Sequence, residues 1–222
     1  MSYTFLRSTV MRKIRNRVNR VEGVEFLPKE GGFIIAPNHH AFYDGPALVS
    51  VVEAILRPSG RMIYSIMKYQ IYQRIGGSVA GAWLGAISVN PHEPQKTLEP
   101  ALDVLRRGNV ILIFPHGGMV SEGGQGVQEG KTGAVRLAMW SGLPIIPAAV
   151  VGPAGFKPLM AVRNFFHASE RVNIRFGAPL IFPRRSPDQV SRAELRQGTT
   201  QLLSAIEQLR TEVISKSFSP IS

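Results

Sequence analysis

One histidine and one aspartate are spaced so that they could act together as a general base. His39 directly follows a short apolar run that is typical of a buried strand, and Asp44 comes five residues later, where a helix is expected to begin. A turn between strand and helix would fold the carboxylate back onto the imidazole. An aspartate bound to one ring nitrogen fixes the tautomer and leaves the other nitrogen free to deprotonate a substrate hydroxyl. The pattern therefore indicates proton abstraction without a covalent enzyme intermediate.

Spacing alone leaves two alternatives open. His40 also lies within reach of Asp44, so either histidine could be its partner. Asp44 could instead cap the helix, beside a histidine that has only a structural role.

Other chemistries find little support in the sequence. The chain has no cysteine, which excludes a thiolate nucleophile, a disulfide and a cysteine zinc site, and none of its five histidines has the spacing of a helix-borne zinc site. Gly130-Lys131-Thr132 lacks the upstream glycine of a nucleotide-binding loop, since that position is Gln125. Residues 76–80 lack the last glycine of a serine nucleophile elbow. We expect neither a metal nor a cofactor.

The elements that must position these residues alternate along the chain. Apolar runs, helical periodicity and glycine stops predict strands at residues 33–36, 62–67, 85–89, 110–114, 145–151 and 172–176, and helices at 44–57, 97–107, 131–141 and 192–215. A glycine-rich loop covers residues 115–130. The alternation predicts an α/β fold, a single domain with a mixed, mostly parallel sheet flanked by helices.

The first 21 residues are basic and amphipathic. Their cations are Arg7, Arg12, Lys13, Arg15, Arg17 and Arg20, and they include no acidic residue. Apolar residues recur at helical spacing, at Leu6, Val10, Met11, Ile14, Val18 and Val21. We expect residues 1–21 to form a helix on an anionic membrane surface, ahead of a domain at residues 22–222. The alternative is an ordinary helix whose apolar stripe packs on the core.

The overall charge limits the class of partner. The formal net charge is +11 and the isoelectric point is near 10.5, which favours a polyanion such as nucleic acid or an anionic membrane. Basic residues are not interleaved with aromatics and no recognition motif occurs, so we expect no nucleic acid. Residues 137–156 carry no charge, but glycines and prolines interrupt them, so we expect no membrane-spanning helix.

Four short blocks follow one another in the middle of the chain. They are residues 38–44 (Asn-His-His-Ala-Phe-Tyr-Asp), 84–90 (Leu-Gly-Ala-Ile-Ser-Val-Asn), 113–118 (Ile-Phe-Pro-His-Gly-Gly) and 143–147 (Leu-Pro-Ile-Ile-Pro). In this order they resemble the glycerol-phosphate and lysophospholipid acyltransferase family. The resemblance implies an acyltransferase domain at residues 22–222. It also implies transfer of an acyl chain from acyl-CoA or acyl carrier protein to a lipid hydroxyl, in phospholipid or glycolipid biosynthesis.

The resemblance also assigns roles to individual residues. It implies that His39, rather than His40, is the base and that Asp44 orients it. The residues that it implies for substrate binding are Asn38, Phe114, Pro115, His116, Gly117, Gly118, Lys131, Pro144 and Pro147.

The chain departs from the family pattern at two places. The second block usually ends in an arginine that holds the acceptor's phosphate, and that position is Pro91. The third block usually has glutamate and threonine where this chain has His116 and Gly118. We therefore expect weak use of lysophosphatidic acid and stronger use of another lipid alcohol. Cations that could replace the arginine are Arg61, Lys68, Arg74, Lys96 and Lys131.

The expected partners follow from these points. They are an anionic membrane surface, a lipid acceptor and acyl-CoA or acyl carrier protein, with the protein peripheral on the cytoplasmic, inner face of the membrane. The alternative function is a non-catalytic lipid-binding protein on the same fold.

Overall fold

The computed structural model describes residues 3–74, 76–78, 81, 85–90, 94–117, 130–152 and 171–217. Its helices are α1 (Tyr3–Arg15), α2 (Asp44–Leu56), α3 (Tyr69–Arg74), α5 (Pro94–Arg106), α6 (Gly133–Ser141) and α8 (Arg192–Ser217). Its strands are β1 (Val18–Glu22), β2 (Phe33–Pro37), β3 (Ile63–Lys68), β4 (Ala86–Val89), β5 (Val110–Leu112), β6 (Ile145–Val151) and β7 (Val172–Phe176). Short 3-10 helices cover Val24–Phe26, Arg57–Ser59 and Pro187–Gln189.

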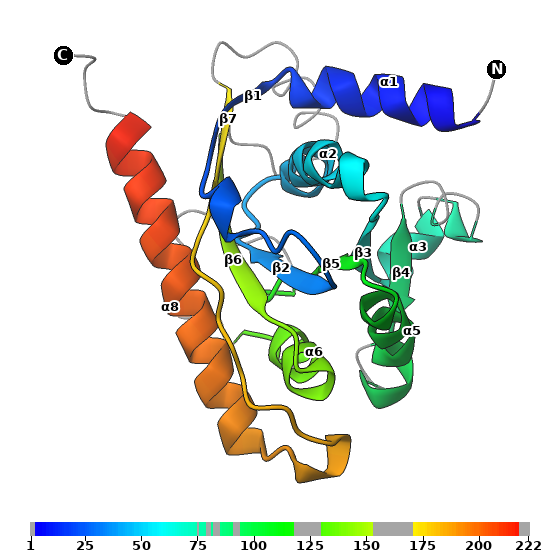
Figure 1. Ribbon diagram of the computed structural model, residues 1–222, viewed down its shortest axis with the longest axis vertical. Coiled ribbons are helices and arrows are strands. Elements are labelled where there is room, and N and C mark those ends of the chain that lie inside the picture. Colours follow the sequence, from blue (N-terminus) through cyan, green and yellow to red (C-terminus); the bar gives the residue numbers. More distant parts are fainter. Residues whose placement is uncertain are drawn as a thin grey trace.

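The strands form one seven-stranded sheet in the order β1-β7-β6-β2-β5-β3-β4 (Figure 1). The five strands from β6 to β4 are parallel, whereas β7 runs antiparallel to β6 and β1 runs parallel to β7. This confirms the mixed, mostly parallel sheet expected from the sequence. Strand β2 lies in the middle, with Ile35 paired to Leu112 of β5 and to Ile146 of β6.

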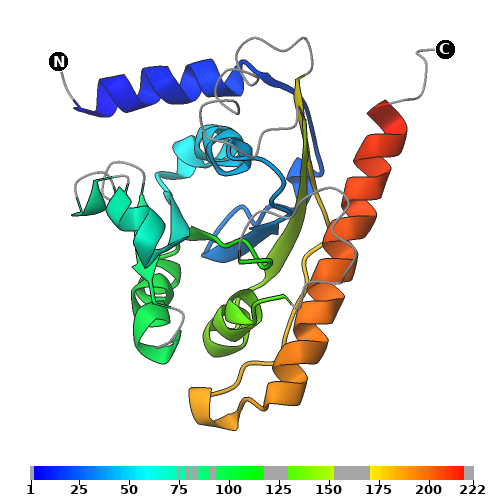
Figure 2. The same ribbon diagram turned by 180° about the vertical axis from the view of Figure 1, so that it is seen from behind.

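Helices cover both faces of the sheet. Alternate residues of a strand point to opposite faces, so Phe33 and Ile35 pack in the cluster on the side of α2, while Ile34 and Ala36 pack in the cluster on the side of α5, α6 and α8. Figure 2 shows α1 and α2 on one side of the sheet and α5, α6 and α8 across it. All four side chains are fully buried. Because β2 is held on both faces and along both sides, its end is a rigid support for the residues that follow.

The N-terminal segment differs from the expectation. The helix ends at Arg15, and residues 18–22 form strand β1, which pairs with β7. The apolar stripe of α1 packs on the core, since Met11 is 6% exposed and Ile14 packs on the same cluster. Arg7 forms an ion pair with Glu53 of α2. The apolar side of α1 thus contacts the core, as the alternative expected, and residues 18–21, which were expected to be helical, belong to a strand instead.

The remaining N-terminal cations lie in different surroundings. Arg12 and Lys13 are exposed on α1, and Arg15 and Arg17 are partly buried. Arg20 lies on β1 and pairs with Glu22, at 2.6 Å between Nε and Oε1. In the described parts of the chain, no helix combines the length and the apolar character that crossing a bilayer requires.

The five parallel strands give the sheet two distinct edges, and the site depends on one of them. We call the edge where β6, β2, β5, β3 and β4 end the C-terminal edge, and the edge where they begin the N-terminal edge. His39 follows β2, residues 114–117 follow β5, and α3 follows β3, so all three segments lie at the C-terminal edge. In parallel α/β sheets, ligands bind at this edge.

Candidate active site

His39 and Asp44 face each other across the turn between β2 and α2. Nδ1 of His39 lies 3.3 Å from Oδ2 of Asp44. The same carboxylate oxygen accepts hydrogen bonds from the backbone N–H groups of His40 at 2.7 Å and Ala41 at 2.8 Å. The side chain of Asp44 is 2% exposed and that of His39 is 20% exposed. A buried, fixed carboxylate therefore holds an imidazole that substrate can reach.

Asp44 does not cap the helix as the alternative supposed. It is the first residue of α2, and the N-cap position belongs to Tyr43, whose side chain makes no capping hydrogen bond. The carboxylate of Asp44 instead reaches back to His40 and Ala41. The aspartate thus closes the turn that carries His39. The contact between His40 and this carboxylate is made by the backbone N–H of His40, so its ring does not take the place of His39.

Phe114 holds the imidazole from a second direction. Its ring stacks on the ring of His39 with centroids 4.1 Å apart and planes at 28°. Phe114 follows β5, and β5 is hydrogen-bonded to β2, so the sheet itself brings the two rings together. With a face stacked and Nδ1 directed at Asp44, the orientation of the ring is fixed, and Nε2 has no hydrogen-bond partner within the described ranges.

Asn38 supports the turn from below. Its side-chain N–H donates to the carbonyl of Val150 at 2.9 Å, and its side-chain oxygen accepts from the N–H of Val150 at 2.7 Å. Asn38 is 1% exposed. The side chain thus continues the pairing of β2 with β6 beyond the end of the strand. Both polar atoms of the amide bind the backbone of β6, so Asn38 positions the turn that carries His39.

The loop after β5 brings Lys131 back to the site. The N–H of Gly117 donates to the carbonyl of Phe114 at 3.1 Å, and the N–H of Lys131 donates to the carbonyl of Pro115 at 2.6 Å. Gly117 has φ of +68°, and a Cβ there would lie 2.7 Å from Cγ of Lys131. The glycine therefore permits both the tight turn and the close approach of the lysine stem. Gly118 and Pro91 lie outside the described residues.

His116 has the most distinctive electrostatic surroundings of this loop. Burial lowers the pKa of its imidazole, and His40 lowers it further; Glu207 of α8 acts in the opposite direction, and His39 adds to the lowering. Its Nδ1 is buried and has no hydrogen-bond partner in the part of the chain that the structure describes. Burial therefore favours the uncharged form of the imidazole, and its Nδ1 has no partner among the described residues.

Comparison with known proteins decides the family. A family model described as Acyltransferase matches residues 18–151. The chain belongs to the acyltransferase family. The match confirms the resemblance inferred from the four blocks, and it places the His39–Asp44 turn and the His116 loop inside the matched region.

Two relatives of this acyltransferase are informative. It is 28% identical over 144 residues to a 1-acyl-sn-glycerol-3-phosphate acyltransferase of Bacillus subtilis (strain 168). That match covers 63% of this chain and 66% of the relative, just under two thirds of its length. The crystal structure of the 1-acyl-sn-glycerophosphate (LPA) acyltransferase PlsC from Thermotoga maritima superposes with a TM-score of 0.54 at 18% identity, over 94% of this chain and 84% of that chain. The second likeness shows a shared fold.

Two predicted substrate-binding residues of the acyltransferase lie away from His39. The carbonyl of Pro144 accepts from the N–H of Ile34, at the start of β2, so Pro144 lies at the N-terminal edge. Pro147 is paired with Ala36 inside the sheet. Its ring packs beside Gly177, where a Cβ would lie 3.1 Å from Cγ of Pro147. In the structure, both prolines shape and pack β6.

The cations that could replace the missing arginine of the second block lie at different edges of the sheet. Arg61 lies at the N-terminal edge, where it donates to the carbonyls of Gly31 and Pro28 at 2.8 and 2.9 Å. Lys68 and Arg74 lie at either end of α3. Lys131 is the cation whose stem contacts the His116 loop, and the side chain of Lys96 is outside the described residues.

Sequence reasoning missed three contacts that shape the site. It did not foresee the backbone of Val150 as the partner of Asn38, the stacking of Phe114 on His39, or the influence of Glu207 on His116. The first two follow from strand order, which no local pattern specifies. Among the described residues, no three histidine, aspartate or glutamate side chains are grouped so that they could hold a metal ion.

Proposed function

We propose that this acyltransferase moves a fatty acyl chain from the thioester of coenzyme A or acyl carrier protein to the hydroxyl of a membrane lipid. The observation that carries the proposal is the fixed His39, with Nδ1 directed at Asp44 and Nε2 available. Nε2 takes the proton of the acceptor hydroxyl as its oxygen attacks the thioester carbonyl. The tetrahedral intermediate then expels the thiolate, which takes the proton from the imidazolium. Asp44 stabilises that imidazolium while it exists.

The negative charge on the attacked carbonyl oxygen needs a hydrogen-bond donor. Pro115 has no N–H, and the N–H of Gly117 is already donated to Phe114. Within the described part of the loop, the backbone N–H of His116 is the donor that remains for this oxygen. A donor fixed in a turn costs no reorganisation when the charge develops.

The acceptor that we propose is a 1-acylglycerol 3-phosphate or a close relative of it. The name of the Bacillus subtilis relative supports this acceptor, as does a cation at the His116 loop. Lys131 would bind the phosphate in place of the arginine that the second block lacks. Its ammonium is a compact point charge rather than a bidentate fork, so it would bind the phosphate less selectively than arginine.

A second candidate acceptor is a lipid alcohol without phosphate, which the sequence alone favoured. The specific observation behind it is His116, whose burial lowers its pKa and keeps the ring uncharged. A neutral imidazole suits a hydroxyl or a carbonyl better than a dianion.

An acceptor panel tests both candidates. The full chain, in detergent, receives labelled acyl-CoA or acyl carrier protein with 1-acylglycerol 3-phosphate, glycerol 3-phosphate or monoacylglycerol. We expect the highest kcat/KM with 1-acylglycerol 3-phosphate. Lys131→Gln should raise KM for that lipid about tenfold, which is the loss of roughly one charged contact, and should leave KM for monoacylglycerol unchanged.

Two results would overturn the proposal. Monoacylglycerol as the best acceptor, with no effect of Lys131→Gln, would establish the second candidate. Absence of transfer to every acceptor by a folded protein that still binds lipid would establish the non-catalytic alternative.

We also propose that the enzyme lies on the cytoplasmic face of the membrane, because the acyl donor is water-soluble and the acceptor is a membrane lipid.

A further inference from the structure

Helix α3 exposes large apolar side chains beside the active site. Tyr69 is 52% exposed and Ile71 is 44% exposed. Both follow directly from the end of β3, so they lie at the C-terminal edge of the sheet. Single exposed apolar residues are common on protein surfaces. Tyr69 and Ile71, however, lie on one short helix at the same edge as His39, so a shared binding partner would explain their exposure.

The same helix is flanked by unpaired positive charge. Lys68 and Arg74 are exposed, and neither has an ion-pair partner among the described residues. The sequence contains no aspartate or glutamate from residue 54 to residue 92. Some cations elsewhere are paired within the fold, as Arg106 is with Glu99 and Asp103. We call Lys68, Tyr69, Ile71 and Arg74 the α3 surface; along the chain, its two exposed apolar residues lie between two exposed cations.

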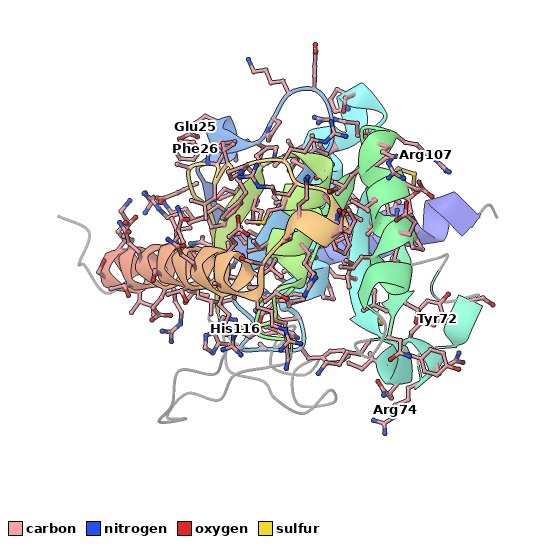
Figure 3. All side chains as sticks on the ribbon, turned by 90° about the horizontal axis from the view of Figure 1, so that it is seen from below. Glu25, Phe26, Tyr72, Arg74, Arg107 and His116 are labelled. Carbon is pink, nitrogen blue, oxygen red and sulfur yellow. The ribbon has the colours of Figure 1, made fainter. Side chains whose placement is uncertain are left out.

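The position of this surface matches the path of a lipid substrate. Strand β3 is separated from β2 by β5 alone, so α3 begins about 10 Å from the end of β2, at about 4.8 Å per strand. Figure 3 shows Tyr72 and Arg74 of α3 on the same side of the molecule as His116, away from Glu25, Phe26 and Arg107. A flat surface that touches α3 would therefore pass in front of the catalytic turn.

The N-terminal helix is less suited to this role than the sequence suggested. Its residues Met11 and Ile14 pack on the core, and Arg7 is paired with Glu53. Other exposed apolar side chains, such as Met62 and Ile181, lie at the opposite edge, since Met62 precedes β3 and Leu180, next to Ile181, pairs with Ile145 at the start of β6. A membrane bound at α1 or at the N-terminal edge would not lie next to His39.

We propose that the α3 surface docks the enzyme on an anionic lipid bilayer. Tyr69 and Ile71 enter the headgroup region, and Lys68 and Arg74 pair with lipid phosphates. Docking there orients the C-terminal edge toward the bilayer, so that a lipid hydroxyl reaches Nε2 of His39 without leaving the interface. This inference rests on the proposed function only in taking the acceptor to be a membrane lipid.

Co-sedimentation with vesicles tests the surface directly. The full chain is mixed with vesicles of phosphatidylglycerol and phosphatidylcholine, or of phosphatidylcholine alone. We expect Tyr69→Ser with Ile71→Ser to weaken binding to the anionic vesicles by about tenfold or more, since two apolar anchors are lost. The matched control, Met62→Ser with Ile181→Ser, removes two exposed apolar side chains at the opposite edge and should bind like the unmodified protein. Lys68→Gln with Arg74→Gln should weaken binding and reduce its dependence on salt.

Activity in detergent separates this inference from the proposed function. Both serine pairs should retain acyl transfer to detergent-dispersed acceptor, which also shows that they fold. Inactivity of the unmodified protein, together with loss of vesicle binding in the α3 pair, would refute the proposed function and leave the docking surface standing. Unchanged vesicle binding by Tyr69→Ser with Ile71→Ser would refute the docking surface.

Two other outcomes would also refute the proposal that the α3 surface docks on a membrane. If Arg12→Gln with Lys13→Gln abolishes binding while the α3 variants bind normally, α1 is the docking element. If the α3 variants lose only transfer from acyl carrier protein, with vesicle binding intact, the surface serves that acidic protein and not a membrane.

Discussion

The two edges of the sheet use their polar groups in opposite ways. At the N-terminal edge, Arg61 donates to two backbone carbonyls and lies over the ring of Phe33, 5.6 Å from its centroid. The side chain of Asn109 accepts from the N–H of Met62 at 2.9 Å. At the C-terminal edge, Nε2 of His39 and Nδ1 of His116 have no partner within the described residues. The polar groups named at the N-terminal edge are bonded within the fold, whereas these two ring nitrogens at the C-terminal edge have no such bond.

This difference separates residues that hold the fold from residues that act on substrate. A buried polar atom without a partner has a cost in stability, which a fold tolerates where a ligand later supplies the partner. The N-terminal edge has no such atoms among the groups named above. Substitutions at the C-terminal edge should therefore change catalysis, and substitutions at the N-terminal edge should change stability.

The largest effect should come from the catalytic turn. His39→Ala should remove nearly all transfer, on the order of 10³-fold or more in kcat, because the general base is lost. Asp44→Asn should cost about 10²-fold or more, because an amide cannot stabilise the imidazolium. His40→Ala is the matched control; it keeps the backbone N–H that binds Asp44, and its effect should be below about tenfold.

Steady-state kinetics with labelled acyl-CoA measure these losses, and circular dichroism confirms folding. Equal losses from His39→Ala and His40→Ala would contradict the assignment. Full activity of the Asp44→Asn protein would do so as well.

A cation at the opposite edge should affect stability and not catalysis. Arg61→Gln removes hydrogen bonds to Gly31 and Pro28 at a partly exposed position, so the free energy of unfolding should fall by about 1 kcal/mol. Urea denaturation measures this change, and kcat/KM should equal that of the unmodified protein. A lower kcat/KM at unchanged stability would place Arg61 in substrate binding, and the contrast between the edges would fail.

The smallest effect concerns His116 and pH. Burial lowers its pKa in the folded state, with His40 and His39 adding to the lowering and Glu207 opposing it. The unfolded chain therefore binds a proton first, as the pH falls through about 6.5. The contribution of His116 makes the protein less stable on acidification, from about pH 6.5 down to the lowered pKa of the folded state.

The neutral variant His116→Gln should reduce this loss. Thermal unfolding of both proteins between about pH 7.5 and 5.5 provides the measurement, and the difference between them isolates His116 from His39 and His40, which both proteins retain. A steeper loss of Tm in the variant on acidification would show that the pKa of His116 is raised in the folded state, contrary to this expectation.

Local patterns in the sequence predicted much of the fold. Residues 145–151 and 172–176 form strands with the expected bounds, because the first segment is an apolar run, the second alternates apolar and polar residues, and each is followed by a glycine. The pairing of His39 with Asp44 was also predictable, since five residues fit one turn between a strand and a helix. These features depend on neighbours in the chain, which a single sequence displays.

Features that depend on distant partners were not predictable. Val18 and Val21 continue the helical spacing of α1, yet pairing with β7 makes them part of a strand. Nothing near Asn38 indicates that its amide binds Val150, and nothing near Arg61 indicates that carbonyls of residues 28 and 31 hold it. Long-range pairing overrides local periodicity in each case.

The pairing of β1 with β7 has a consequence for synthesis of the chain. Val18 is paired with Val172, roughly 150 residues later, a stretch that a ribosome adds in about 8–30 s at about 5–20 residues per second. Strand β2 can join β5 and then β6 before this, since both strands are translated ahead of β7. The catalytic turn can thus form on the nascent chain while β1 still lacks its neighbour. Holdase chaperones that bind unpaired strands would then have their longest opportunity at the N-terminal segment, and this outer strand pair would close only after β2 has joined β5 and β6.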